Sequence, residues 1–290
     1  MAKAIVFGGS GFLGSHVADQ LSDAGHAVTI FDRAPSAYVR PDQQMICGDL
    51  LDSEVVETAI EGADIVYNFA AIADLNEARD KPLETVRVNI EGNIHILEGC
   101  NKHNVQRFFY ASTVYAESRD GGFYRCSKQA AESYVKEYNA RYGLDYTILR
   151  YGSLYGPRSG SDNGLWRIVN QALSNGVLRY EGNPEAMREY IHVVDAARAS
   201  VAALGDEFVN QCVIFTGHEP MRVADLLKMI AEIIGLEADI EFTDAVDNGH
   251  YVRTPYAYQR DVGQKYIPPL HVDLGQGLLE LIAYIDTGSK

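Results

Sequence analysis

The chain has 290 residues, of which 47% are hydrophobic and 22% are charged, an ordinary globular composition. Its formal net charge of −15 argues against nucleic acids and anionic membranes as partners. The first strand begins too early for a signal peptide, and no apolar stretch approaches the roughly 18 residues of a membrane span. The four cysteines are scattered without a C-x-x-C motif, which favours reduced thiols, and the histidines lack metal-ligand spacing. Together these features favour a cytoplasmic protein without a metal site.

The first predicted element is a strand followed by a glycine turn and a helix. Residues 4–7 form a short apolar run that suits a buried parallel strand, and apolar residues recur at helical spacing after residue 11. The turn between them contains Gly8, Gly11 and Gly14 at three-residue spacing. Such a turn lets backbone amides approach a pyrophosphate at the positive end of the helix. We therefore predict a dinucleotide-binding turn.

A second strand at residues 28–31 ends in Asp32, about twenty residues after the glycines. A carboxylate at this position accepts hydrogen bonds from the adenosine ribose and repels a 2′-phosphate. Asp32 therefore favours NAD over NADP, and Arg33 beside it would soften that preference.

Strands and helices then alternate along the chain. Strands are predicted at residues 45–47, 64–69, 107–112 and 145–150, and helices at 53–60 (capped by Ser53), 83–100 and 123–142 (closed by Gly143). This alternation predicts an α/β fold with a doubly wound, Rossmann-type parallel sheet. Ligands are then expected at the carboxyl ends of the strands.

After Tyr151, glycines and prolines break the chain into shorter pieces. We expect a smaller C-terminal α/β lobe with helices near residues 165–174, 194–204 and 223–234, and a last helix beginning at Asp273. The predicted division assigns residues 1–152, with parts of 190–215, to the NAD-binding domain. Residues 153–290 then form mainly a substrate-binding lobe.

Tyr124 and Lys128 are the residues on which the predicted chemistry depends. They lie four residues apart near the start of a predicted helix, and this spacing places both side chains on one face. A tyrosine with an ordinary pKa near ~10 is a poor base at neutral pH, but a nearby ammonium would lower that pKa. The pair is therefore a candidate general acid and base for a hydroxyl of the substrate.

In this order, the motifs resemble those of the extended short-chain dehydrogenase/reductase family, in particular its nucleotide-sugar epimerases and dehydratases. The resemblance covers essentially the whole chain. It rests on the glycine turn Gly8–Gly14, Asp49-Leu50, Asn68-Phe69-Ala70-Ala71, Asn89-Ile90, Tyr124-Arg125-Cys126-Ser127-Lys128, the stretch from Arg150 to Arg158, and the stretch from Arg188 to Asp195.

This resemblance implies NAD as the cofactor, a nucleotide-diphosphate sugar as the substrate, and a role for each matching residue. Thr113 or Ser112 would orient a substrate hydroxyl, Tyr124 would remove its proton, and Lys128 would hold the nicotinamide ribose. The implied cofactor-binding residues are Gly8, Ser10, Gly11, Phe12, Leu13, Gly14, Asp32, Arg33, Asp49, Leu50, Phe69, Ala70, Ala71, Tyr124, Lys128 and Tyr151. The implied substrate-binding residues are Ala73, Asp74, Ser153, Asn163, Arg188 and Arg253, with the two arginines on the diphosphate.

Three departures from the family pattern bear on the reaction. Val114-Tyr115 stands where dehydratases carry Asp-Glu, which disfavours 4,6-dehydration unless Tyr115 or Glu117 takes an unusual role. Ser153 replaces a customary asparagine, and only ten residues separate Thr113 from Tyr124, which suggests a more open sugar pocket. The leading hypothesis is therefore C4 epimerisation through a transient 4-keto sugar. Dehydration is the alternative, and a net ketone reductase or an NAD-sensing protein without turnover is disfavoured.

Two further expectations concern packing and assembly. His16, His192 and Arg158 are expected to have structural roles. By the same resemblance, the two long helices would form an intersubunit four-helix bundle in a homodimer. The side chains suggested for that seam are Ala130, Ala131, Tyr134, Val135 and Tyr138.

Overall fold

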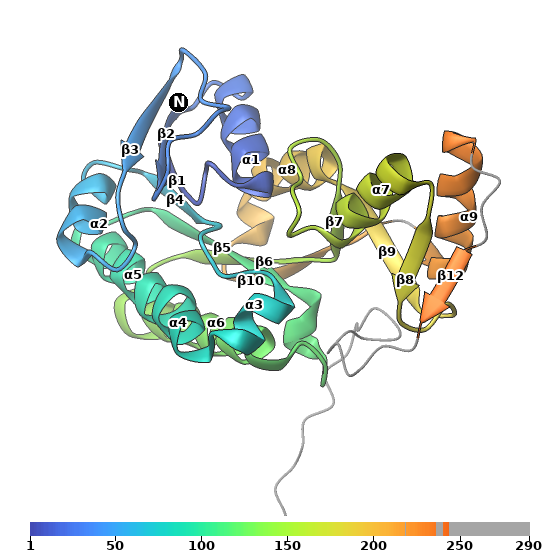
Figure 1. Ribbon diagram of the computed structural model, residues 1–290. Helices are drawn as coiled ribbons and strands as arrows, with labels where there is room; N and C mark the ends of the chain where they lie inside the picture. Colours follow the sequence, from blue (N-terminus) through green and yellow to red (C-terminus); the bar gives the residue numbers. More distant parts are fainter. Residues whose placement is uncertain (218, 236–239, 244–290) are drawn as a thin grey trace, which may run out of the picture. The chain divides into compact units, whose positions relative to one another are not determined.

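In the computed structural model, which describes residues 1–217, 219–235 and 240–243, seven parallel strands form the main sheet (Figure 1). Their order is β3-β2-β1-β4-β5-β6-β10. Their bounds are Lys3–Phe7 (β1), Ala27–Asp32 (β2), Gln43–Cys47 (β3), Ile65–Asn68 (β4), Arg107–Thr113 (β5), Tyr146–Tyr151 (β6) and Gln211–Phe215 (β10). The order reverses between β1 and β4, which is the Rossmann-type arrangement that the alternation predicted.

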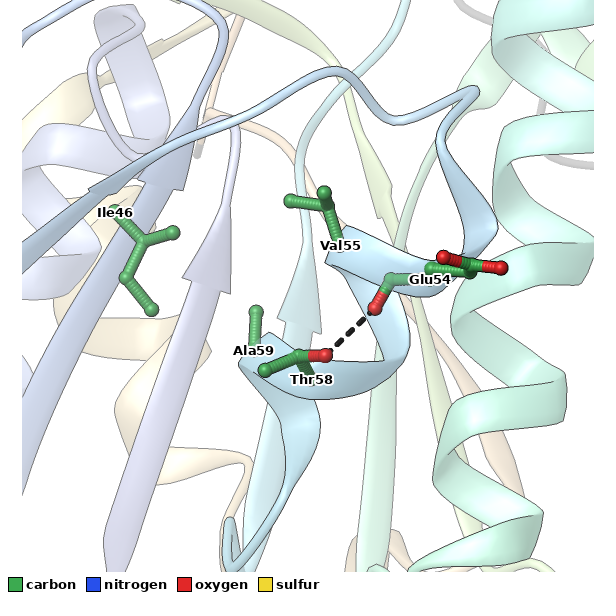
Figure 2. Close-up of a pocket in the computed structure, with 5 residues that line it drawn as sticks. All are labelled: Ile46, Glu54, Val55, Thr58 and Ala59. Atoms are coloured by element: carbon green, nitrogen blue, oxygen red, sulfur yellow. Dashed lines mark hydrogen bonds between the residues drawn. The ribbon is translucent and has the colours of Figure 1, made fainter.

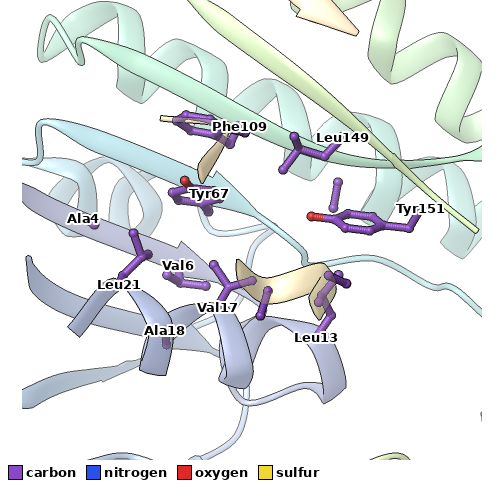
Figure 3. Close-up of a cluster of buried hydrophobic side chains, with 14 of the residues drawn as sticks. Ala4, Val6, Leu13, Val17, Ala18, Leu21, Tyr67, Phe109, Leu149 and Tyr151 are labelled. Carbon is purple, nitrogen blue, oxygen red and sulfur yellow. The ribbon is translucent and has the colours of Figure 1, made fainter. Parts of the chain in front are cut away.

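Helices cover both faces of this sheet. One face packs on α1 (Phe12–Asp23) and α8 (Val193–Ala202), and Figure 3 shows part of this core, with side chains from α1 and four strands. The other face packs on α2 (Ser53–Ile60), α5 (Gly92–Lys102) and α6 (Gly122–Tyr142). The central strands β1, β4, β5 and β6 are buried on both sides, as their nearly continuous apolar sequences require, whereas the edge strands β3 and β10 are partly exposed.

The helix predicted at residues 83–100 is built from three consecutive pieces. They are α4 (Pro82–Val86), a π-helical turn η1 (Arg87–Glu91) and α5. A short helix α3 (Leu75–Asp80), a 3-10 turn η2 (Val114–Glu117) and a second 3-10 turn η3 (Asp206–Phe208) were not predicted. Asp52, not Ser53, caps α2, because its carboxylate accepts a hydrogen bond from the amide of Val55. Gly143 ends α6 with φ +74°, as predicted.

A smaller group of elements follows β6. Its helices are α7 (Gly164–Asn175) and α9 (Val223–Ile234), which share a third apolar core. Its strands form a three-stranded sheet, β11-β9-β7, and a two-stranded sheet, β12-β8. Their bounds are Ser153–Tyr155 (β7), Leu178–Glu181 (β8), Met187–His192 (β9), Pro220–Arg222 (β11) and Ile240–Thr243 (β12). The helix predicted from Asp273 lies outside the described residues.

The seam suggested for a dimer is wrong at three of its five positions. Ala131, Val135 and Tyr138 lie in the core between α6 and the sheet, with 0%, 1% and 8% of their surface exposed. They point inward because they share the helix face that the sheet covers. Tyr134, on another face of α6, is exposed.

In the described part of the chain, no helix is both long and apolar enough to span a membrane.

Candidate active site

The glycine turn closes between β1 and α1 in a conformation that side chains would prevent. Gly8 has φ +74°, and a Cβ there would lie 2.5 Å from the backbone nitrogen of Ala70. A Cβ on Gly14 would lie 2.3 Å from the carbonyl oxygen of Gly8. Gly11 is the N-cap of α1 and supplies no side-chain cap, so the first amides of the helix stay available to an anion. The turn therefore fits a dinucleotide pyrophosphate.

Asp32 fixes this turn from the end of the neighbouring strand. The backbone amide of Ser10 donates to Oδ2 of Asp32 over 3.0 Å, and the hydroxyl of Ser10 donates to the carbonyl of Ala34. The carboxylate is half-buried beside the turn, whereas Arg33 is exposed. This is the position at which an adenosine ribose meets a carboxylate in such folds.

Further predicted cofactor residues follow β3 and β4, and Tyr151 is the last residue of β6. Asp49 accepts a hydrogen bond from the amide of Leu51, and Leu50 is buried against Gly92. Phe69 and Ala70 come directly after β4, and the amide of Ala70 donates to the side chain of Asn68. The carboxyl ends of these strands meet at one edge of the sheet, as do Gly8 and Asp32.

Two residues near this edge face inward. Tyr151 points its hydroxyl to Ser200, at 2.6 Å, and is buried in the core. The side chain of Asn89 accepts from the amide of Ile72 and donates to the hydroxyl of Ser127, so it ties the segment after β4 to α6. These hydrogen bonds give Asn89 a structural role.

Tyr124 and Lys128 meet Thr113 where β5 ends. The hydroxyl of Thr113 is hydrogen-bonded to that of Tyr124. Lys128 is 3% exposed, and its Nζ donates to the carbonyl of Ala111 over 2.7 Å. Nζ also lies 5.8 Å from the ring centre of Tyr124. The four-residue spacing thus places Tyr124 and Lys128 on one face of α6, which packs against the end of β5 that carries Thr113.

Burial shifts the pKa of both residues. It raises the pKa of Tyr124 to about 12, although the hydrogen bond from Thr113 acts in the opposite direction. It lowers the pKa of Lys128 to about 7, although the charge of Glu132 acts against this. Burial of the phenol thus raises the pKa of Tyr124, in the direction opposite to the lowering expected from Lys128, whose Nζ bonds to a backbone carbonyl.

Strand alternation separates the two candidate hydroxyls of β5. Ser112 points to the face opposite Thr113, where its hydroxyl donates to Oε1 of Glu132 over 2.5 Å. The geometry therefore favours Thr113 over Ser112 as the residue beside Tyr124. Sequence reasoning missed Glu132, although it continues the spacing of Tyr124 and Lys128 by one more turn.

The first carboxylate after Thr113, that of Glu117, is already paired with a cation. Val114 is buried, and Glu117 forms an ion pair with Arg150. The ring of Tyr115 meets that of Tyr124 edge to face, with 6.4 Å between the centres. Glu117 is thus committed to a cation and is poorly suited to the unusual acid–base role considered for it.

The predicted substrate residues flank the same edge from two sides. Asp74 caps α3 and lies 3.6 Å from the guanidinium of Arg167 in α7. Asn163 caps α7, and its amide donates to the carbonyl of Leu154 in β7. Ala73 precedes Asp74, and Ser153 begins β7.

The two arginines expected on the diphosphate lie in different parts of the chain. Arg188 is 7% exposed in β9, and its Nη1 donates to the carbonyl of Met187. Arg253 lies outside the described residues.

Three residues that were expected to have structural roles make contacts that hold the fold together. His16 is buried and lies 3.0 Å from the carbonyl oxygen of Pro157, and burial lowers its pKa. His192 caps α8. Arg158 pairs with Asp19 of α1.

A pocket of about 330 Å³ lies away from these residues, between β3 and α2. Figure 2 shows its lining, which consists of Ile46, Glu54, Val55, Thr58 and Ala59. None of the predicted site residues lines it. In the described part of the chain, no group of three or more His, Cys, Asp or Glu side chains could hold a metal ion.

Comparisons with known proteins agree with this geometry. The model of the NAD dependent epimerase/dehydratase family matches residues 4–211. The UDP-N-acetyl-alpha-D-glucosaminuronate decarboxylase of Bacillus cytotoxicus is 31% identical over 75% of both chains. The UDP-glucose 4-epimerase of Thermotoga maritima, solved with UDP-glucose, is 25% identical with a TM-score of 0.79, over 88% of this chain and 90% of its own. The UDP-glucose 4-epimerase of Thermus thermophilus, solved with NAD, is 26% identical with a TM-score of 0.78, over 90% of this chain and 95% of its own.

Proposed function

Because this chain belongs to the NAD dependent epimerase/dehydratase family, and is thus an NAD-dependent enzyme acting on nucleotide sugars, we propose that it is a nucleotide-sugar 4-epimerase. The observation that carries this choice is the surroundings of Thr113 and Tyr124. Their hydroxyls are bonded to each other, and the nearby carboxylate of Glu117 is paired with Arg150. Epimerisation by oxidation and reduction at one carbon needs a single acid–base group, whereas dehydration needs more.

The proposed chemistry assigns a task to each residue at the edge of the sheet. The amides of the glycine turn bind the pyrophosphate, and Asp32 binds the adenosine ribose. Bound NAD supplies a reversible acceptor for the hydride. Thr113 orients the C4 hydroxyl of the sugar, and Tyr124 takes its proton and later returns it. Lys128 stands beside Tyr124 and binds the nicotinamide ribose.

The substrate would lie between this edge and the elements that follow β6. We propose that Arg188 and Arg253 bind the diphosphate, since a guanidinium offers a fork of donors to phosphate oxygens. Ala73, Asp74, Ser153 and Asn163 would line the sugar side. In this proposal residues 1–152, with parts of 190–215, hold the cofactor, and residues 153–290 mainly hold the substrate.

We further propose that the enzyme works in the cytoplasm as a homodimer that pairs α4, α5 and α6 with their copies. Support comes from exposed apolar side chains on this side of the molecule. Leu83 and Val86 of α4 are 65% and 48% exposed, and Tyr134 of α6 is 44% exposed. In this proposal Leu83 and Val86 join Tyr134 at the interface, and the buried residues Ala131, Val135 and Tyr138 do not take part.

A panel of UDP-, GDP-, dTDP- and CDP-sugars tests the reaction. The protein is incubated with each sugar in D2O, and products are followed by mass spectrometry and NMR. A 4-epimerase gives an isomer with unchanged mass and no deuterium from the solvent, because the hydride returns to the carbon it left. Loss of 18 mass units would instead establish the dehydratase, and net consumption of reduced cofactor would establish a reductase. NAD released on denaturation distinguishes an enzyme that recycles its cofactor from one that exchanges it.

Replacing Tyr124 by Phe removes the proposed acid–base group while keeping the ring. We expect turnover to fall by at least about a thousandfold, within the range that a positioned acid–base group contributes. NAD binding, measured by calorimetry, should persist. Full activity in this variant would remove Tyr124 from the mechanism.

A further inference from the structure

A buried group of charges lies one helical turn beyond Lys128. Its centre is Glu132, which is 4% exposed. The carboxylate accepts from Nε and Nη2 of Arg150 over 2.9 and 2.7 Å, and from the hydroxyl of Ser112. Arg150 also pairs with Glu117. The group therefore links α6, β5, β6 and η2, the elements that carry or adjoin Thr113, Tyr124 and Lys128.

The charges of this group do not balance without Lys128. Two carboxylates, Glu132 and Glu117, face one guanidinium, that of Arg150, which leaves one net negative charge. A protonated Lys128, on the same face of α6 as Glu132, makes the group neutral. Buried charges are stable only when opposite charges accompany them, so the ammonium and the carboxylates support each other.

Outside this buried group, the nearby formal charge is the exposed ammonium of Lys136, one helical turn after Glu132, which, like Glu132, acts electrostatically on Cys212. Lys128 Nζ lies 4.9 Å from the ring centre of Tyr110 in β5 and bonds to a backbone carbonyl. Burial raises the pKa of the Cys212 thiol in β10 to about 11, so that it is neutral at pH 7. Tyr124 is neutral there as well. Among the described residues, Glu132 is the charge that opposes the loss of the proton from Lys128 on burial.

We propose that Glu132 is a positioning residue, whose carboxylate, clamped by Arg150 and Ser112, holds Lys128 as an ammonium directed at Tyr124. This inference rests on the proposed role of Lys128 in the epimerase reaction. The effect of Glu132 on the charge of Lys128 does not depend on that role, because the charge state of Lys128 can be measured without turnover.

The test is a titration of Lys128 in the full-length chain labelled with 13C at the lysine Cε. NMR follows the Cε signal with pH, and Lys128→Met identifies it. Replacing Glu132 by Gln keeps the size and one acceptor oxygen but removes the charge, so the pKa of Lys128 should fall by about one unit or more. Glu137→Gln, which removes an exposed carboxylate of the same helix, should leave it unchanged.

Glu117→Gln provides a second variant at the more accessible end of the group. It should lower the pKa of Lys128 in the same direction but less, because Arg150 lies between the two residues. This variant decides the matter if Glu132→Gln does not fold. An unchanged Lys128 titration in the folded variants would overturn the proposal.

Once a substrate is found, activity gives a separate readout. In Glu132→Gln the alkaline fall of kcat should move to lower pH by the same interval as the Lys128 titration, with KM for the sugar little changed. Glu132→Asp, which keeps the charge, should restore much of the original profile. A uniform loss of kcat at every pH would show a merely structural role. If no nucleotide sugar is converted, the proposed function fails. The NMR titration still tests independently whether Glu132 raises the pKa of Lys128.

Discussion

Ser112 and Thr113 are adjacent hydroxyls with different surroundings. Alternation along β5 sends one to Glu132 and the other to Tyr124. The sequence alone left both as candidates, because the alternation cannot be assigned to a face without the packing. It predicted Tyr124 and Lys128 on one face but not Glu132, since a glutamate four residues after a lysine is usually an exposed ion pair. Only Arg150, brought in from β6, and the burial of the group distinguish it.

Lys128 should give the protein a characteristic dependence of stability on pH. Its pKa is about 7 in the folded chain and about 10.4 when unfolded. Between these values the unfolded state binds one proton more, so the free energy of unfolding should rise with pH, by at most about 1.4 kcal/mol per pH unit. Below pH 7 Lys128 is protonated in both the folded and the unfolded state, so it no longer makes the free energy of unfolding depend on pH.

Urea unfolding at pH 6, 7, 8 and 9 measures this slope. Lys128→Met has no proton to lose, so the wild type should gain stability relative to the variant between pH 7 and 9. Between pH 6 and 7 the difference between the two proteins should be nearly constant. Parallel curves over the whole range would contradict the lowered pKa.

At the level of elements, the conformation of the glycine turn was predicted correctly because each glycine has a separate local reason. Gly8 requires a positive φ, and Gly14 allows α1 to approach the turn. The long helices and the buried strands were also predictable, because their patterns extend over many residues. The short strands β7, β8, β9, β11 and β12 were not, since each is defined by a partner distant in sequence.

Gly14→Ala tests the turn as a cofactor site. The added Cβ would come within 2.3 Å of the Gly8 carbonyl oxygen, so the backbone of the turn must move. We expect NAD affinity, measured by calorimetry, to fall at least tenfold. The control is Gly164→Ala in α7, where the nearest atom to a new Cβ is a guanidinium nitrogen 3.9 Å away. Unchanged NAD affinity in Gly14→Ala would place the pyrophosphate elsewhere.

Hydrogen bonds from a buried arginine stabilise the carboxyl end of α8. The buried guanidinium of Arg107 in β5 donates to the carbonyls of Ala203, Leu204 and Gly205 and to the hydroxyl of Thr147. Since these acceptors end a helix, the cation also meets the negative end of its dipole.

Arg107→Met should leave these buried acceptors without a donor. A loss of about 2 kcal/mol or more is expected, which corresponds to a fall in Tm of about 4–8 °C for a chain of this size. Differential scanning fluorimetry measures it. Arg198→Met, which alters an exposed arginine of α8, should change Tm by less than about 1 °C. Equal Tm values for the two variants would contradict the role of Arg107.

At the scale of the whole molecule, the fold class was predictable and the self-association surface was not. Helical spacing on α6 shows which residues share a face but not whether the sheet or a partner covers it. The structure assigns Ala131, Val135 and Tyr138 to the sheet and leaves Leu83, Val86 and Tyr134 exposed.

Leu83→Glu therefore tests the proposed homodimer. A charge at this exposed apolar position should convert a dimer into a monomer in size-exclusion chromatography with light scattering. The matched control is Ile233→Glu in α9, which places the same charge on a side chain that is 76% exposed in another part of the chain. A wild type that elutes as a monomer, or a Leu83→Glu variant that stays dimeric, would reject this interface.

The last strand of the main sheet has a consequence for synthesis and fragmentation. β10 joins the free edge of β6 only after the chain has left the sheet, built β7–β9 and returned through α8. During translation the edge of β6 therefore stays open until Phe215 has emerged from the ribosome. A fragment that stops at residue 152 would keep this edge permanently, with the backbone donors and acceptors of β6 ready to pair with another chain. Residues 1–152 are thus not a self-sufficient piece of polypeptide without the parts of 190–215 that the predicted cofactor domain also includes, and expressed alone they should aggregate.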